Sequence, residues 1–362
     1  MLEGRRCAAR ASLQFERPRA SGASALESFI KMRFPVSLYV SMTSYLLRKS
    51  LSGAERFPLV LMLEPTHRCN LNCAGCGRIR EYHDTINQEM TLEECLRAVD
   101  DAGTPVVTIT GGEPLLYSHI QELARCVLAK GKHIYFCTNA MLLEESLHLF
   151  RPTDHFTWNI HFDGTEAVHE HIIGRPGGFR RALAAVRAAK ERGFRVSTNT
   201  TVFRESDVDD LERLFTQLTA AGVDGILVAP GFSYEAAPKE VFLTRKEINE
   251  KFQRISSWGK RFPIISNPLY LEFVAGKRSL TCTPWGNPTR NPRGWKSPCY
   301  LLTDTHYPTY SEFMEKTDWD YYASGKDPRC AQCMVHCGYE PTVVRTLRGK
   351  DLLRMVRWNL HA

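Results

Sequence analysis

The fold of this chain is decided by the stretch LVLMLEPTHRCNLNCAGC at residues 59–76. The apolar run at 59–63 predicts a strand, and Cys69, Cys73 and Cys76 follow on the loop at its carboxyl end. Three thiolates suit iron–sulfur ligation, whereas a structural zinc ion normally takes four ligands. Three protein ligands leave one iron of a four-iron cube open to a small molecule. The stretch therefore predicts a 4Fe–4S cluster at a strand end.

Outward from this stretch, short apolar runs alternate with segments of helical periodicity. Strands are expected at 59–63, 106–109, 134–137, 156–160, 195–200 and 225–228, and helices at 92–102, 120–130, 142–149, 179–192 and 208–221. This order predicts parallel strands joined by right-handed crossovers. The expected fold class is α/β, a partial (β/α)6 TIM-like barrel with an irregular cysteine-rich C-terminal extension. Functional residues should then lie at the carboxyl ends of the strands.

The rest of the chain divides around this barrel at residues 57–231. Residues 1–33 are expected to be a disordered tail, or to precede a true start at Met32, and Cys7 within them has no assigned role. Residues 34–56 should form an amphipathic helix that packs on the barrel, contacts a membrane surface or borders a hydrophobic substrate entrance. The extension covers 232–345, with a helix at 246–260 and irregular structure at 263–310. Residues 346–362 should form a basic helix or tail.

Composition narrows the function classes. The chain has 362 residues, 43% hydrophobic and 24% charged, with a formal charge of +7 and 12 cysteines. It has no apolar run of membrane-span length and no dense basic block, so we expect no membrane span and no nucleic-acid partner. Cysteines in two spaced clusters within a large chain favour a metal or cofactor over disulfides.

A second motif, GGEP, follows the second expected strand. Its residues are Gly111, Gly112, Glu113 and Pro114. The glycines let the backbone approach a ligand closely, and Glu113 can accept hydrogen bonds from an ammonium group. Further polar side chains follow later strands, either as ligand contacts or as structural loop residues: Thr138, Asn139, His161, Asp163 and Asn199.

Together, the cysteine trio and GGEP resemble the radical S-adenosylmethionine (SAM) superfamily. The resemblance implies that Cys69, Cys73 and Cys76 hold a 4Fe–4S cluster whose open iron binds the amino and carboxylate groups of SAM. It further implies that GGEP lines the methionine amino group, and that the polar strand-end residues contact the ribose and carboxylate. The implied chemistry is reductive cleavage of SAM to a 5′-deoxyadenosyl radical.

Further segments resemble the adenosyl-hopene transferases of hopanoid biosynthesis: PLVLMLEP, CNLNCAGCG, CTNAMLLE, CTPWGNPTRN, PCYLL, TDWD and CMVHCGYEP. That resemblance implies addition of the radical to the alkene of diploptene, with SAM consumed as a substrate. The implied partners are a hydrophobic polycyclic lipid and a flavodoxin or ferredoxin, in the cytoplasm or at the inner membrane. Thr66-His67 and the polar run 78–88 depart from the family pattern. They leave another polyprenoid or alkene open as the substrate. A peptide, modified with the help of an auxiliary cluster, is the separate alternative.

Cys137 ends the third expected strand, directly before Thr138. Addition of a radical to an alkene leaves a carbon radical on the substrate, and a thiol is a competent hydrogen donor. We therefore hypothesise that Cys137 supplies this hydrogen. The alternative is a buried small hydrophobe, the common place of a free cysteine.

The second cysteine group lies in the extension. Cys330, Cys333 and Cys337 form a CxxCxxxC motif, and Cys282 and Cys299 precede it in a Pro- and Gly-rich stretch. A region poor in regular structure often needs a metal as a cross-link. The spacing resembles the auxiliary-cluster domains of radical SAM proteins. It predicts a second 4Fe–4S cluster, with structural zinc or unligated thiols as the alternatives.

Overall fold

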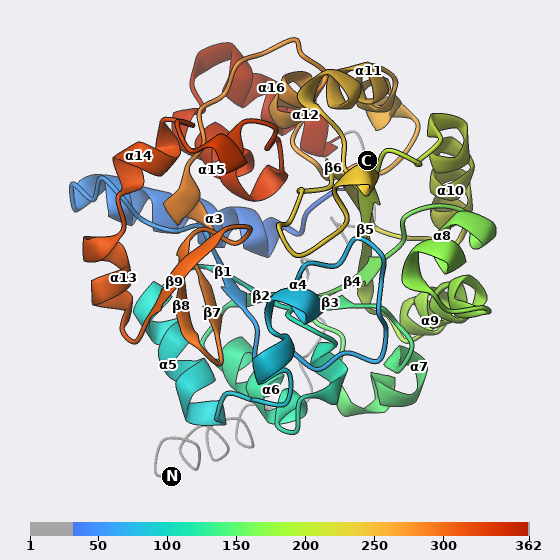
Figure 1. The fold of residues 1–362 in the computed structure, drawn as a ribbon, viewed down its shortest axis with the longest axis horizontal. Helices are drawn as coiled ribbons and strands as arrows, with labels where there is room; N and C mark the ends of the chain where they lie inside the picture. The colour runs from blue at the N-terminus through green and yellow to red at the C-terminus, as the bar shows by residue number, and fades with distance from the viewer. Residues whose placement is uncertain (1–31, 361–362) are drawn as a thin grey trace.

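The computed structural model describes residues 32–360, so the expected N-terminal tail, with Cys7, lies almost wholly outside the described residues. Within them, six parallel strands form the barrel wall in chain order, with the helices around it (Figure 1). These strands are β1 (Val60–Leu63), β2 (Val106–Ile109), β3 (His133–Thr138), β4 (Phe156–His161), β5 (Arg195–Val202) and β6 (Gly225–Pro230). The predicted partial barrel is confirmed, and the loops at the carboxyl ends of its strands share one rim.

The helices that cover the barrel begin and end close to the predicted positions. They are α5 (Leu92–Ala102), α6 (Ile120–Ala129), α7 (Leu143–Ser146), α9 (Gly178–Glu191) and α10 (Val208–Ala220). Two short helices that the apolar periodicity did not indicate lie in rim loops: α4 (Arg78–Glu81) and α8 (Glu166–Ile173). Helix α4 has four residues, three of them polar, and α8 has eight residues, half of them polar, so both are too short for an apolar periodicity to be recognised.

Alternation along the strands separates the core from the barrel interior. Residues such as Val107, Phe136 and Trp158 face the helices and are fully buried in the main hydrophobic core. Their neighbours Tyr135 and Cys137 point the other way and are partly exposed. The interior of the barrel is therefore accessible, and the side chains that line it are available for chemistry.

The extension is more regular than the sequence indicated. Residues 263–310, expected to be irregular, contain α12 (Pro268–Val274), β7 (Thr289–Asn291), β8 (Gly294–Pro298) and β9 (Thr303–Tyr307). β7 pairs in parallel with β1, and β8 and β9 continue the sheet in antiparallel pairing. These strands are short and polar, so they carry no apolar alternation by which to recognise them. They bring the extension directly against the strand that precedes the cysteine trio.

The remaining helices lie in the extension and at the two ends of the described chain. They are α3 (Val36–Leu51), α11 (Arg245–Ile255), α13 (Tyr310–Lys316), α14 (Trp319–Ala323), α15 (His336–Thr346) and α16 (Gly349–Leu360). The helix expected at 246–260 ends at Ile255, and a 3-10 segment, Ser256–Lys260, completes it.

Helix α3 lies at the base of the barrel, away from the rim. Ser41 Oγ is hydrogen-bonded to Nε2 of His133, the first residue of β3, at 3.3 Å. Arg195, the first residue of β5, donates to the carbonyl of Arg33 just before the helix, at 3.1 Å. Since both contacts are at the amino ends of strands, α3 does not border an entrance at the rim, and that interpretation of the helix is wrong.

Candidate functional site

The cysteine trio lies on the rim loop between β1 and α4. Cys69, Cys73 and Cys76 are free thiols, each half-buried. The guanidinium of Arg80 donates to the carbonyl oxygens of Cys73 and Cys76 and holds the loop in its turn. Burial raises the pKa of Cys69 to about 11, so the site carries protons that a metal must displace on binding.

The GGEP segment packs backbone to backbone against this loop. The amide of Gly112 donates to the carbonyl of Thr66 at 3.1 Å, and that of Glu113 donates to the carbonyl of Arg68 at 2.7 Å. A Cβ atom on Gly112 would lie 2.0 Å from the Arg68 carbonyl oxygen. Only glycine fits there, so the second motif holds the segment that leads into Cys69.

The carboxylate of Glu113 joins two loops of the rim by hydrogen bonds. Its side chain is fully buried, and its carboxylate accepts hydrogen bonds from Thr138 Oγ1 at 2.9 Å and from the amides of Asn139 at 2.9 Å and Leu115 at 3.1 Å. Burial raises the pKa of Glu113 to about 7, although these hydrogen bonds oppose the shift. The contacts of this carboxylate are thus with the protein, and they tie the second rim loop to the third.

Asn139 joins the third strand end to the trio. Its Nδ2 lies 3.8 Å from Sγ of Cys69 and donates to Oδ1 of Asn70 at 2.7 Å. Amide donors directed at sulfur are typical of sites that hold iron–sulfur clusters, because they stabilise negative charge on the thiolates. The thiols, the glycine cradle and this amide together fit a 4Fe–4S cluster.

Polar side chains continue along the rim at β4 and β5. His161 Nε2 lies 2.5 Å from Oδ2 of Asp163, whose Oδ1 accepts from the amide of Thr201 at 2.8 Å. Burial alone would lower the pKa of His161, but the Asp163 carboxylate outweighs it and raises that pKa. Asn199 is paired with His161 in the β4–β5 register and is partly exposed. His161 and Asn199 can offer hydrogen bonds to a ligand in the barrel mouth, whereas Asp163 is only 1% exposed and both of its oxygens are engaged by the protein.

Cys137 lies one layer deeper in the barrel. Asn159 Nδ2 donates to its Sγ at 3.4 Å, and Ser197 Oγ in turn donates to Oδ1 of Asn159 at 3.0 Å. Burial raises the pKa of Cys137 to about 11, so the group is a thiol at neutral pH. The Cys137 side chain is partly exposed to the barrel interior. In this it differs from Cys95, which is a fully buried core residue.

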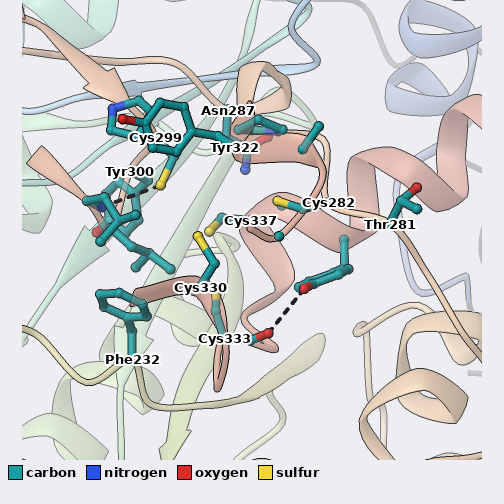
Figure 2. Close-up of a pocket in the computed structure, with 18 of the residues that line it drawn as sticks. Phe232, Thr281, Cys282, Asn287, Cys299, Tyr300, Tyr322, Cys330, Cys333 and Cys337 are labelled. Carbon is teal, nitrogen blue, oxygen red and sulfur yellow. Dashed lines mark hydrogen bonds between the residues drawn. The ribbon is translucent and has the colours of Figure 1, made fainter. Parts of the chain in front are cut away.

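The five cysteines of the extension line one cavity of about 220 Å³. Figure 2 shows the side chains of Cys282, Cys299, Cys330, Cys333 and Cys337 gathered around it. Contact is close at one edge, since a Cβ on Gly338 would lie 2.5 Å from Sγ of Cys282. Burial, followed by the charges of the other four cysteines, raises the pKa of Cys282. Residues separated by up to 55 positions in the sequence are thus brought to one place.

Sequence reasoning missed a buried ion pair between the two cysteine groups. Arg78 Nε lies 2.9 Å from Oε1 of Glu64, and both side chains are almost fully buried. Arg78 Nη2 also donates to the carbonyl of Tyr300 at 2.6 Å. Arg78 follows Cys76 by two residues and Tyr300 adjoins Cys299, so one guanidinium joins the two loops. The only sequence signal was the unusual polarity of 78–88.

Within residues 32–360, no three His, Cys, Asp or Glu side chains converge closely enough to hold a single metal ion. Helices among the described residues are also too short or too polar to cross a membrane.

Two family models match consecutive parts of the chain. Residues 63–218 match the radical SAM superfamily, and residues 226–356 match a domain of unknown function, DUF3463. An AdoMet-dependent heme synthase of Methanosarcina barkeri is 29% identical over 163 residues, which cover 44% of this chain and 46% of that protein. A PqqA peptide cyclase of Granulibacter bethesdensis is 29% identical over 171 residues, 46% of this chain and 45% of that protein. The matches span about half the length of these relatives.

Solved structures extend the likeness in fold to most of the chain. SuiB of Streptococcus suis, bound to its precursor peptide SuiA, aligns with a TM-score of 0.61 at 15% identity, covering 84% of this chain and 70% of that one. The anSMEcpe structure with AdoMet and a peptide aligns with a TM-score of 0.57 at 18% identity, covering 83% and 95%. A 4Fe–4S cluster and SAM are the cofactors of this fold, and the thiols and glycine cradle of the rim suit them. Residues 63–218 therefore match the radical SAM superfamily, and residues 226–356, which follow the barrel, match DUF3463.

Proposed function

We propose that this protein is a radical SAM enzyme whose 4Fe–4S cluster is held by Cys69, Cys73 and Cys76. The observation that carries the proposal is the contact at Gly112, where GGEP meets the trio loop with no room for a side chain. The reduced cluster would supply the electron that cleaves the sulfonium of SAM and produces a 5′-deoxyadenosyl radical. Enzymes of this superfamily need a reductant, and a flavodoxin or ferredoxin is the donor we propose.

The chain's own residues would bind and orient SAM. Glu113 holds the GGEP loop against the third rim loop through Thr138 and the amide of Asn139. We assign the ribose and carboxylate contacts of SAM to His161 and Asn199, because they lie at the carboxyl ends of neighbouring strands, and we propose that the buried Asp163 holds His161 in place for them. A second 4Fe–4S cluster in the five-cysteine cavity is part of the proposal, supported by the gathering of these thiols around one space.

The relatives favour a substrate other than a hopanoid. Two of them are a heme synthase and a peptide cyclase by name, and SuiB carries a bound precursor peptide. Our first substrate class is therefore a peptide, handled with the help of the auxiliary cluster. It would meet the radical between the barrel mouth and the extension.

Addition of the nucleoside radical to the alkene of diploptene is the second candidate, and Cys137 is the observation that favours it. In this reaction a bond forms between C5′ and the terminal alkene carbon, the π bond breaks, and a tertiary carbon radical remains. The Cys137 S–H would give that carbon a hydrogen atom and become a thiyl radical. The same reductant would restore the thiol with one electron and one proton. Asn159 donates to the sulfur and holds it beside the interior, to which the side chain is partly exposed.

The test is anaerobic turnover with dithionite and SAM in D2O, with diploptene present or absent. Wild-type protein should form 5′-deoxyadenosine without the lipid if diploptene is not the substrate. It should form an adduct with one solvent-derived deuterium if diploptene is. Cys137→Ala should still cleave SAM but yield about tenfold less reduced adduct. Cys95→Ala, in the core, is the matched control.

Absence of SAM cleavage under all these conditions would refute the radical SAM assignment itself. SAM cleavage with no adduct from diploptene would refute the second candidate. The substrate would then be sought by comparing lipid and peptide extracts from cells with and without the gene. A full yield of reduced adduct from Cys137→Ala would remove the role of this thiol.

A further inference from the structure

Exposed aliphatic side chains gather on two helices of this molecule. Nine large hydrophobic residues are exposed within the described part of the chain, and eight of them lie on α3 or α16. The ninth is Tyr321, 38% exposed, on α14. The eight are Val36, Val40, Leu47, Leu51, Leu352, Leu353, Val356 and Leu360. Scattered exposed hydrophobic residues are ordinary on a protein surface, but a concentration of this kind marks an interaction site.

On α3 the aliphatic residues occupy the centre of the solvent-facing side. At about 100° per residue, the four of them fall within an arc of about 60°. Tyr45, the buried residue of the helix, lies on the opposite side. Leu51 is 80% exposed and Val40 is 64% exposed. A helix that merely covers a barrel should carry polar residues at these positions, so this stripe is adapted to an apolar contact.

Helix α16 also carries an exposed aliphatic stripe, and it has more basic residues than α3. Its four aliphatic residues span an arc of about 100°, and Leu353 is 62% exposed. The basic residues Lys350 and Arg357 lie along one edge of this stripe, and Arg354, farther round the helix, is paired with Glu272.

On α3, Arg48 in the last turn lies beside the stripe, whereas Lys49 lies on the opposite side of the helix, with its Nζ 5.5 Å from the ring of Tyr45. An apolar stripe bordered by Lys and Arg is the pattern of helices that lie in a membrane interface.

The two helices are joined to each other at the base of the barrel. The amide of Phe34 donates to Oδ1 of Asn359 at 3.1 Å, and Nε of Arg33 donates to the carbonyl of Trp358 at 2.8 Å. The beginning of α3 therefore adjoins the end of α16. Contacts of α3 with the first residues of β3 and β5 place this junction opposite the rim that carries the cysteine trio.

We propose that α3 and α16 form a docking surface for an anionic membrane. The aliphatic stripes would enter the boundary between head groups and acyl chains, and the bordering Lys and Arg would pair with anionic head groups. Charge complementarity favours this occupant over a second copy of the chain, which would bring the same basic residues together. Docking by the base leaves the rim open to the reductant. The proposal does not depend on which substrate the enzyme uses.

The test is flotation of the full-length protein with vesicles of phosphatidylglycerol and phosphatidylcholine, or of phosphatidylcholine alone. Wild type should bind the anionic vesicles and release from them as salt is raised. Leu47→Glu with Leu51→Glu, or Leu353→Glu with Val356→Glu, should each lower the bound fraction about tenfold. Tyr321→Glu should leave it unchanged, because that residue lies outside the two helices. Circular dichroism and thermal unfolding check that each variant is folded.

Three results would overturn the proposal. Equal vesicle binding by wild type and the glutamate variants would show that these helices are not the contact. A dimer that binds no vesicles and that the same substitutions dissociate would assign the surface to a second copy. A monomer that binds no vesicles and loses thermal stability on these substitutions would assign the surface to residues 1–31.

Discussion

At the scale of single residues, the main feature of this molecule is charge in its interior. Arg78 and Glu64 form a buried pair, and Lys296, fully buried, lies 3.3 Å from Glu81 Oε2. Breaking such a pair from one side costs about 3–5 kcal/mol, because a lone charge is left in a medium of low polarizability. The pairs therefore hold the polar segment after the trio against β8 and the loop that carries Cys299.

The sequence could not reveal this burial. The run from Arg78 to Asp84 has the composition of a solvated surface, and its partners Lys296 and Tyr300 are more than 200 positions away. By contrast, the ligand candidates of the trio were predictable, because their spacing is local. Residue types at short spacing can be recognised in a sequence, whereas long-range neutralisation of charge becomes visible only in the structure.

Buried histidines make stability depend on pH. Burial, with a smaller contribution from His155, lowers the pKa of His133 to about 4. Below about pH 6.5 the unfolded chain binds a proton there that the folded chain does not bind, so stability falls as pH falls toward 4. The loss is about 1 kcal/mol per pH unit for this group. In His133→Gln, the free energy of unfolding should therefore fall less steeply between pH 6.5 and 5.

Urea unfolding at pH 7.5, 6 and 5 measures this slope. His83→Gln is the matched control, because the His83 side chain is 81% exposed, and its slope should equal that of wild type. A slope for His133→Gln equal to that of wild type would contradict the assigned burial effect.

At the scale of elements, the barrel was predictable because each strand has its own apolar run and each helix its own periodicity. The strands of the extension were not, because they are held by pairing rather than by an apolar pattern: β7 pairs with β1, β8 with β7, and β9 with β8. The same contact explains why the extension and the trio loop are close. Figure 1 shows these strands beside β1.

A substitution at Gly112 tests the contact between the GGEP loop and the loop that carries the cysteine trio. In Gly112→Ala, the methyl group would lie 2.0 Å from the Arg68 carbonyl oxygen and 2.5 Å from that of His67. The loop to Cys69 must therefore move, and we expect loss of the cluster bound there, with iron falling by about half if two clusters are present. The measurement is iron per chain after anaerobic reconstitution, together with 5′-deoxyadenosine formation.

Gly131→Ala is the control for this substitution. Gly131 has a φ of 69°, but a Cβ atom added there would meet no other atom within 4 Å, so alanine brings backbone strain of about 1 kcal/mol without a clash. It should keep full iron content. Wild-type iron and activity in Gly112→Ala would contradict the role given to the GGEP contact.

At the scale of the whole molecule, two groups of cysteines lie on either side of one interface between barrel and extension. Arg78 reaches from the loop of the first group to the backbone beside the second. The sequence predicted that each group binds metal, but not that the groups share a boundary. Because the groups share this boundary, the number of clusters that the molecule holds is the next property to measure.

Iron counting on paired variants decides that number. Wild-type protein should hold about eight irons per chain, four in each cluster. Joint replacement of Cys69, Cys73 and Cys76 by alanine should leave about four irons and abolish SAM cleavage. Joint replacement of Cys330, Cys333 and Cys337 should also leave about four, yet retain the spectral change that SAM causes at the first cluster. Cys95→Ala, as the control, should keep all eight. If wild type holds only about four irons, and the second triple variant loses none, the five thiols of the extension hold no cluster. The cavity would then have to be explained as space for substrate.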